Sequence, residues 1–119
     1  MQKTKTNENL KSLIQELKKK AIDTDIRIFK RIASDLEKPT RSQRAVNLSR
    51  INRYTKENEL IVVPGKVLGS GDLDHSLTIA AYKFSSSALD KINTSKSKAI
   101  KISDLMNGEV KGKKIRIIG

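Results

Sequence analysis

The chain has 119 residues and no cysteine, and its 25 Lys and Arg against 13 Asp and Glu give a formal net charge of +12. This length predicts one domain, residues 1–119. The lack of cysteine excludes disulfides and thiolate metal sites. No apolar run reaches the roughly 18 residues of a membrane span. The N-terminal residues lack the apolar core of a signal peptide, so we expect a cytoplasmic protein.

The excess of positive charge indicates a polyanionic partner. Many like charges repel one another within a small domain, and a bound polyanion relieves that repulsion. Nucleic acid is the commonest such partner, and an anionic membrane surface is the next candidate. The chain has only two Phe, two Tyr and no Trp, which is too few for extensive stacking on single-stranded bases. The composition therefore favours phosphate-and-shape binding to folded RNA.

Two amphipathic helices are predicted at the start of the chain, over residues 7–21 and 24–37. Apolar side chains recur at helical spacing in both segments, so each should bury one face. The short turn between them predicts a helical hairpin within residues 1–38. A helix-turn-helix DNA-binding protein is the alternative interpretation, but the second helix lacks the Asn and Gln that read bases in the major groove.

An arginine-rich stretch follows over residues 38–53, and it contains no acidic residue. The planar guanidinium of arginine binds phosphate oxygens in a bidentate manner, so this stretch is the first candidate for RNA contact. Its alternative role is surface pairing with Glu57 and Glu59. We expect a short helix after Ser49 that turns two arginines outward together. The candidate RNA-binding residues are Lys38, Arg41, Arg44, Arg50 and Arg53, with Lys66, Lys111, Lys113 and Lys114 in addition.

An internal repeat with an offset of 54 residues is visible from here to the end of the chain. The segment "AVNLSRI" at 45–51 aligns with "AIKISDL" at 99–105, and "IVVPG" at 61–65 aligns with "IRIIG" at 115–119. Each unit should contain two short strands, and the two units should superpose. Ser49 and Ser103 are predicted to cap equivalent short helices. A strand over 77–84 and a helix over 84–95 precede the second unit.

The glycine-rich segment "GKVLGSG", residues 65–71, follows an apolar run, as a phosphate-binding loop would. However, its spacing fits neither the Walker loop nor the dinucleotide fingerprint, because Lys66 follows the first glycine and position 74 is Asp. We expect the glycines to provide positive φ angles or close approach between adjacent strands. Replacing Gly69 with Val should then destabilise the fold, because a β-branched residue does not readily adopt positive φ.

An enzymatic interpretation has little support in the sequence. The single histidine, His75, stands beside Asp72 and Asp74 in a segment typical of a polar turn. The serines at 85–87 suit the start of a helix better than a nucleophilic site, because no motif supplies a base. We therefore expect no catalytic residue, metal, cofactor or small-molecule substrate.

Residues 66–92 resemble the signature of two related families of large-subunit ribosomal proteins, the bacterial L-fifteen family and the archaeal and eukaryotic L-eighteen-e family. The upstream residues and the two-helix start are similar to the L-eighteen-e side, and the compact length is similar to archaeal members. The resemblance implies a non-catalytic protein of the large ribosomal subunit that binds ribosomal RNA beside other ribosomal proteins. It also implies an α/β fold in which an irregular β-β-α superhelix, here residues 39–119, follows the hairpin. The matching elements are Lys66–Gly71, Leu77–Ala81, Phe84, Ser85 and Ala88, and upstream Arg44, Val46, Asn47, Leu48, Ser49 and Ile51.

Overall fold

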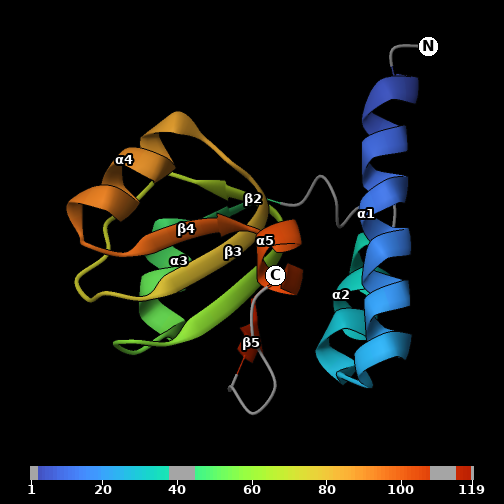
Figure 1. Ribbon diagram of the computed structural model, residues 1–119. Coiled ribbons are helices and arrows are strands. Elements are labelled where there is room, and N and C mark those ends of the chain that lie inside the picture. The colour runs from blue at the N-terminus through green and yellow to red at the C-terminus, as the bar shows by residue number, and fades with distance from the viewer. Residues whose placement is uncertain (1–2, 38–44, 108–114, 119) are drawn as a thin grey trace.

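The computed structural model of the protein describes residues 3–37, 45–107 and 115–118. It has an α/β fold in which two N-terminal helices precede a sheet, as predicted (Figure 1). In chain order the elements are α1 (Lys3–Thr24), α2 (Arg27–Glu37), β1 (Ala45–Asn47), α3 (Leu48–Tyr54), β2 (Leu60–Leu68), β3 (Thr78–Phe84), α4 (Ser86–Thr94), β4 (Lys98–Lys101), α5 (Ile102–Asn107) and β5 (Ile115–Ile117).

The five strands of the described residues form one sheet, and each pairing among them is parallel. Its order is β1-β2-β3-β4, and β5 also pairs with β2. β1 pairs with the last residues of β2, whereas β5 pairs with the first. Strand β3 pairs along most of one edge of β2. Strands β1 and β5 therefore lie end to end along the other edge of β2. The nine-residue β2 is therefore the central strand to which both repeat units connect.

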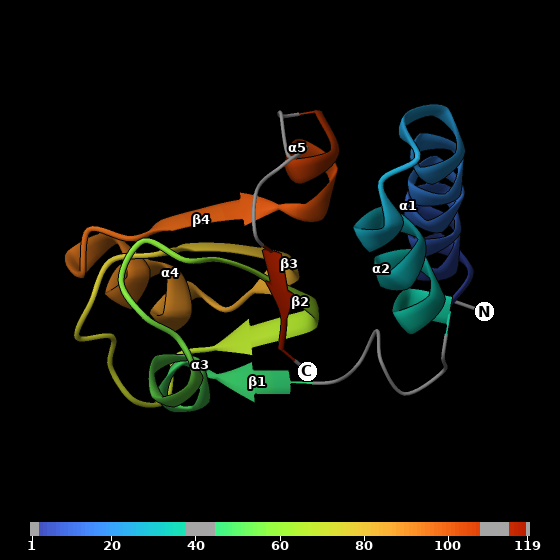
Figure 2. The ribbon, with the colours of Figure 1, turned by 90° about the horizontal axis from the view of Figure 1, so that it is seen from below.

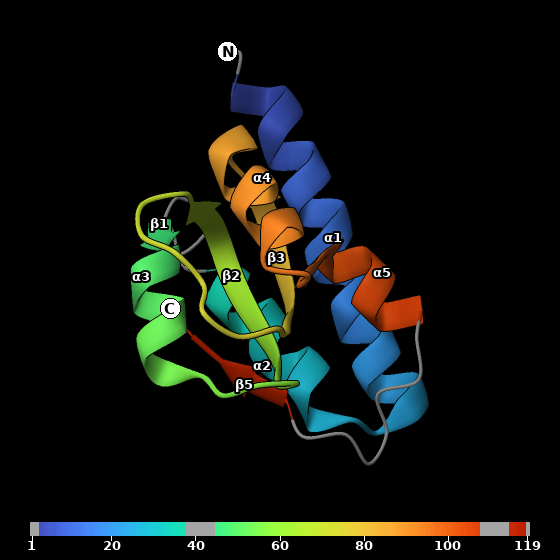
Figure 3. The same cartoon turned by 90° about the vertical axis from the view of Figure 1, so that its left-hand side faces the viewer.

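The sheet lies between two layers of helices (Figure 2). On one face α3 and α4 pack on Ile61, Val63 and Ile79. On the other face α1, α2 and α5 pack on Val62 and Ala80, and α5 lies beside α1 (Figure 3). Alternate residues of a strand point to opposite faces, and both faces are covered. This explains why β2 and β3 have nearly continuous apolar sequences.

The helical hairpin forms because each helix has one apolar stripe. In α2 the side chains of Phe29, Ile32 and Leu36 are buried against α1 and the sheet. Leu17 of α1 is likewise fully buried. A salt bridge of 2.7 Å between Lys18 and Glu37 joins the two helices at the surface, where it contributes little to stability.

The repeat is present as an order of elements but not as a superposable unit. Residues 45–65 and 99–119 each contain a strand, a short helix and a second strand, as predicted. However, the two strands of the first unit, β1 and β2, pair with each other. The two strands of the second unit do not, because β4 pairs with β3 and β5 pairs with β2. The two units therefore connect strands at different separations in the sheet, because β2 and β3 stand between β4 and β5. The prediction that the units superpose is wrong for this reason.

The predicted serine caps are also wrong. Ser49 and Ser103 are the second residues of α3 and α5, not the residues before them. Each helix begins instead at a buried apolar residue, Leu48 or Ile102. The residue before α3, Asn47, makes no side-chain cap. The backbone N–H of Ser49 donates to the carbonyl oxygen of Ser70 at 3.0 Å, so the glycine-rich segment satisfies this end of α3.

Gly69 and Gly71 allow close approach to helices, and not to adjacent strands as predicted. Gly71 has a φ of 91°, and an added Cβ would lie 2.5 Å from the Cβ of Ser49 in α3. At Gly69 the φ angle is not positive, so the reason predicted from the sequence is wrong there. An added Cβ at Gly69 would instead lie 2.8 Å from the backbone nitrogen of Ala88 in α4. These two glycines therefore allow the loop backbone to contact both helices directly.

Candidate nucleic-acid interface

The structure describes three of the nine basic residues that the sequence predicts to contact RNA. These three, Arg50, Arg53 and Lys66, lie on two different surfaces. The other six, Lys38, Arg41, Arg44, Lys111, Lys113 and Lys114, lie outside the described residues.

Helix α3 presents two of the predicted arginines. Leu48 and Ile51 are fully buried, as expected, and Arg50 and Arg53 are exposed. The guanidinium carbon of Arg50 lies 5.2 Å from the centre of the Tyr54 ring, and 48% of Tyr54 is exposed. This cation–π contact orients the guanidinium while leaving its N–H groups open to a ligand.

A third arginine, Arg116 of β5, joins this surface. One of its guanidinium nitrogens donates to the carbonyl oxygen of Tyr54 at 2.7 Å, and another lies 3.4 Å from a carboxylate oxygen of Glu59. A cation is favourable at this C-terminal end of α3. No sequence pattern indicated this neighbour, which is 62 residues away along the chain. We call Arg50, Arg53, Tyr54 and Arg116 the α3 surface.

The alternative role for the α3 arginines, pairing with Glu57 and Glu59, is wrong within the described part of the chain. Glu59 pairs with Arg116 and accepts a hydrogen bond from the backbone nitrogen of Lys56. No ion pair joins Arg50 or Arg53 to an acidic side chain among the residues that the structure describes. Their positive charges are therefore available to an external anion.

Lys66 lies near the carboxyl ends of the parallel strands and not on the α3 surface. In the sheet it pairs directly with Lys83 of β3, and Lys101 ends the next strand, β4, opposite Ala81. We call Lys66, Lys83 and Lys101 the lysine row. Sequence reasoning missed Lys83 and Lys101, although each follows an apolar run. That pattern is the signal for a residue at the end of a buried strand.

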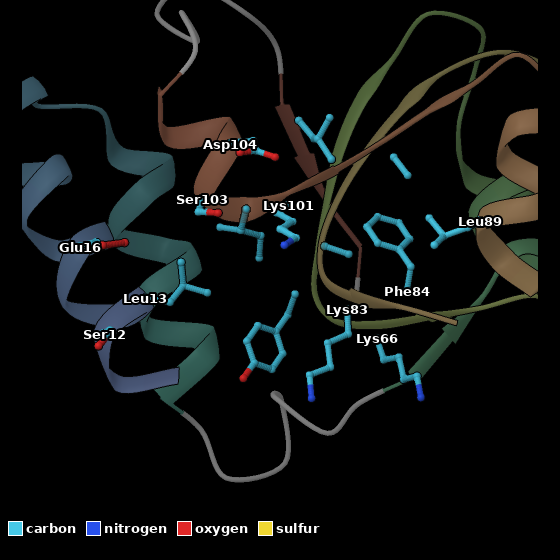
Figure 4. A pocket seen from close by; sticks show the side chains of 15 residues that line it. Ser12, Leu13, Glu16, Lys66, Lys83, Phe84, Leu89, Lys101, Ser103 and Asp104 are labelled. Atoms are coloured by element: carbon cyan, nitrogen blue, oxygen red, sulfur yellow. The ribbon is translucent and has the colours of Figure 1, made fainter. Parts of the chain in front are cut away.

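A groove of about 770 Å³ opens beside the lysine row, between α1 and the ends of the strands (Figure 4). Ser12, Leu13 and Glu16 of α1 line one wall, and Ser103 and Asp104 of α5 lie next to them (Figure 4). The side chains of Lys66 and Lys83 extend in parallel from the opposite side (Figure 4). Apolar residues complete the lining, and these are Ala81, Tyr82, Phe84, Leu89, Ala99, Ile100 and Ile102.

His75 joins the loop after β2 to the C-terminal end of α3. Its Nε2 lies 2.8 Å from the hydroxyl of Thr55, and its Nδ1 lies 2.8 Å from a carboxylate oxygen of Asp74. Hydrogen bonds from His75 and then from Asn52 lower the pKa of the Asp74 carboxyl. The backbone nitrogen of Asp74 also donates to Asn52 at 2.9 Å. These contacts give the Asp-His segment a structural role within a polar turn, as the sequence suggested.

Comparisons with known proteins place this chain in a family. The family described as ribosomal proteins 50S-L15 and 50S-L18e, together with their 60S counterpart, matches residues 8–100. The chain belongs to this family. It is 44% identical over 115 residues to the large ribosomal subunit protein eL18 of Methanothermobacter thermautotrophicus, covering 97% of this chain and 95% of that protein.

Two further archaeal relatives of the ribosomal family carry the same name, large ribosomal subunit protein eL18. The protein of Methanoregula boonei is 46% identical over 114 residues, with 96% of this chain and 94% of that protein covered. The protein of Halobacterium salinarum is 44% identical over 115 residues, with 97% and 98% covered. The similarity thus extends over nearly the whole chain. Within the described residues, no helix has the length and apolar character needed to cross a membrane.

Proposed function

We propose that this protein is a structural constituent of the large ribosomal subunit in the cytoplasm, where it binds ribosomal RNA through phosphate and shape contacts. Membership of the ribosomal protein family supports this role, as do the eL18 relatives that match nearly the whole chain. The net charge of +12 supports a polyanionic partner. Neighbouring ribosomal proteins are its further partners.

The RNA-binding part of this proposal rests on the α3 surface. Arg50 and Arg53 share the exposed face of a helix whose other face is buried in the core. Because the core holds this helix in place, the backbone of both arginines is fixed, and the Tyr54 ring also orients the Arg50 guanidinium toward phosphate oxygens. In the sequence, the stretch that contains Arg41 and Arg44 directly precedes β1, and β1 leads into this helix. We assign this stretch to the same RNA contact.

We infer that the helical hairpin and the sheet act as a single domain without catalytic activity. Leu17 and Phe29 of the hairpin share one buried cluster with Val62 and Ala80 of the sheet, so the two parts bury each other's apolar faces. The side chain of Ser85 accepts a hydrogen bond from the Ala88 backbone nitrogen as the N-cap of α4. A capping role of this kind supports the view that the serine cluster serves the fold.

Filter binding to large-subunit ribosomal RNA across a salt series tests the proposal. The double variant Arg50→Ala, Arg53→Ala should keep its fold, because both side chains are exposed. It should bind more weakly, and the slope of log affinity against log salt should fall by about 1.4–1.8, since each lost phosphate contact removes about 0.7–0.9. Extending the change to Arg41 and Arg44 should lower the slope further.

The matched control is the double variant Lys30→Ala, Arg31→Ala on the exposed face of α2, which removes the same charge. It should change the slope less than the α3 variant. This control also tests the DNA-binding alternative, because a helix-turn-helix protein would read duplex DNA with this helix. A wild-type protein that prefers duplex DNA over large-subunit RNA, and loses that preference in the α2 variant, would contradict the proposed function.

A further inference from the structure

The lysine row places three cations at the same edge of the sheet. Lys66, Lys83 and Lys101 stand near the carboxyl ends of three neighbouring parallel strands. Lys66 and Lys83 are directly opposite in the sheet register, and adjacent strands are about 4.8 Å apart. Like charges in this arrangement destabilise a sheet. All three side chains are exposed, so the fold does not require them for packing.

No acidic side chain of the described residues forms an ion pair with the lysine row. Glu16 and Asp104 line the groove from α1 and α5, but within this part of the chain neither is ion-paired with these lysines. The ammonium group of Lys83 lies 5.5 Å from the centre of the Tyr82 ring, which positions it at the groove. Within the part of the chain that the structure describes, the row is thus a group of three lysines at the groove without ion-pair partners.

The apolar lining of the same groove includes two of the four aromatic side chains of the chain: Tyr82, which packs toward the face covered by α1 and α2, and Phe84, which packs toward the face covered by α3 and α4. Both are only partly buried. Leu89 of α4 also belongs to this lining, and 39% of it is exposed. A basic groove with accessible aromatic rings is the combination that binds single-stranded nucleic acid, because phosphates contact the cations while a base stacks on a ring.

We propose that an unpaired RNA strand crosses this groove, with its phosphates on Lys66, Lys83 and Lys101 and one unstacked base against Tyr82. This proposal rests on the proposed function and adds a second contact, distinct from the α3 surface. The cations alone would suit any polyanion. The ring beside them favours RNA over an acidic protein segment, because a carboxylate gains nothing from an aromatic ring.

Fluorescence anisotropy of the full chain with a labelled oligouridine of about 12 nucleotides tests the groove. The variant Lys66→Gln, Lys83→Gln, Lys101→Gln should lower the salt slope by about 2, and affinity at 0.1 M salt by about a hundredfold, since each contact contributes about 0.7 log units per decade of salt. The melting temperature of this variant should rise above that of the wild type, because like charges in register are removed. An unchanged slope would overturn the proposal.

The variant Tyr82→Leu separates the base contact from the charge contacts. It keeps an apolar side chain but removes the ring, so affinity for the oligouridine should fall about fivefold or more while the salt slope stays unchanged. The matched charge control is Arg27→Gln, Lys30→Gln, Arg31→Gln on α2, which removes three positive charges elsewhere. If the control lowers the slope as much as the lysine variant, the binding is not specific to the groove and the proposal fails.

Competition with an oligoglutamate of the same charge distinguishes RNA from an acidic protein segment. We expect it to displace the labelled RNA poorly at equal charge concentration. Equal displacement, together with insensitivity to Tyr82→Leu, would assign the groove to a protein partner and overturn the proposal. If the groove variants leave binding to large-subunit RNA unchanged while the α3 variant weakens it, the groove proposal fails and the proposed function stands. If the wild type does not bind that RNA, both fail.

Discussion

The two basic surfaces of this protein hold their charges in different ways. On the α3 surface, Arg50 lies against the Tyr54 ring, and Arg116 bonds to both the Tyr54 carbonyl and Glu59. The lysine row has no ion-pair partner in the described part of the chain, and two of its members oppose each other in the sheet. Arg50 and Arg116 are therefore positioned before any ligand arrives. Lys66 and Lys83 carry like charges in register, which does not favour the sheet, and an anion bound there would neutralise them.

The glycine-rich loop connects the two surfaces, and the largest effect should follow from changing it. Gly69 stands three residues after Lys66, and the next residue, Ser70, accepts the hydrogen bond from the N-terminal end of α3. Gly69→Val would force its side chain against the Ala88 backbone nitrogen and the Ser87 hydroxyl of α4. We expect destabilisation of about 3 kcal/mol, as for severe overpacking, and a fall in melting temperature of about 10 °C or more.

Thermal unfolding by circular dichroism measures the effect of Gly69→Val, with Ser70→Ala as the control because the Ser70 side chain is exposed. RNA binding at both surfaces should be lost together as the variant unfolds. ATP and NAD should bind neither the wild type nor the variant. Measurable nucleotide affinity in the wild type that disappears in the variant would contradict the structural role of the loop. A melting temperature equal to that of the control would show that α4 moves aside without cost.

Exchanging the two types of cation should sharpen the comparison with an effect of intermediate size. Arg50→Lys with Arg53→Lys preserves charge but removes the planar fork, so affinity for large-subunit RNA should fall about fivefold with an unchanged salt slope. The reverse exchange, Lys66→Arg with Lys83→Arg, should leave affinity equal or higher, because a phosphate contact with a point charge needs no fork. Filter binding at several salt concentrations measures both. Equal losses in the two exchanges would mean that the surfaces do not differ in this way.

The smallest effect should come from the polar turn beside the α3 surface. The pKa of Asp74 is lowered in the folded protein, first by its hydrogen bond with His75. Its contribution to stability is therefore present above the pKa of the unfolded chain and is lost as pH falls through the lower folded value. The melting temperatures of the wild type and Asp74→Asn should differ slightly near neutral pH and converge below about pH 4. A difference that persists unchanged at pH 2 would contradict this assignment.

Local patterns in the sequence were sufficient to predict most of the helices and strands, and the net charge indicated a polyanionic partner. The apolar stripes of α1 and α2 and the outward pair Arg50 and Arg53 follow from side-chain periodicity, which depends only on neighbouring residues. Ser85 was predicted at a helix start, and it caps α4. The serines at 49 and 103 do not cap their helices, because the helices there begin at Leu48 and Ile102. The burial of Leu48 and Ile102 determines where these two helices begin, and the distant carbonyl of Ser70 satisfies the start of α3.

By itself, the sequence determined an α/β chain with an N-terminal helical hairpin, a repeated order of elements, a strong positive charge and a family resemblance. These features depend on composition and short-range spacing. Only the tertiary structure decided which basic residues stand together. The parallel pairing of β2, β3 and β4 brings Lys66 beside Lys83 and Lys101, and the pairing of β5 with β2 brings Arg116 to Tyr54. The repeat in sequence did not specify these pairings, because nearly identical apolar strands can pair in several orders, and the packing of helices on both faces selects one.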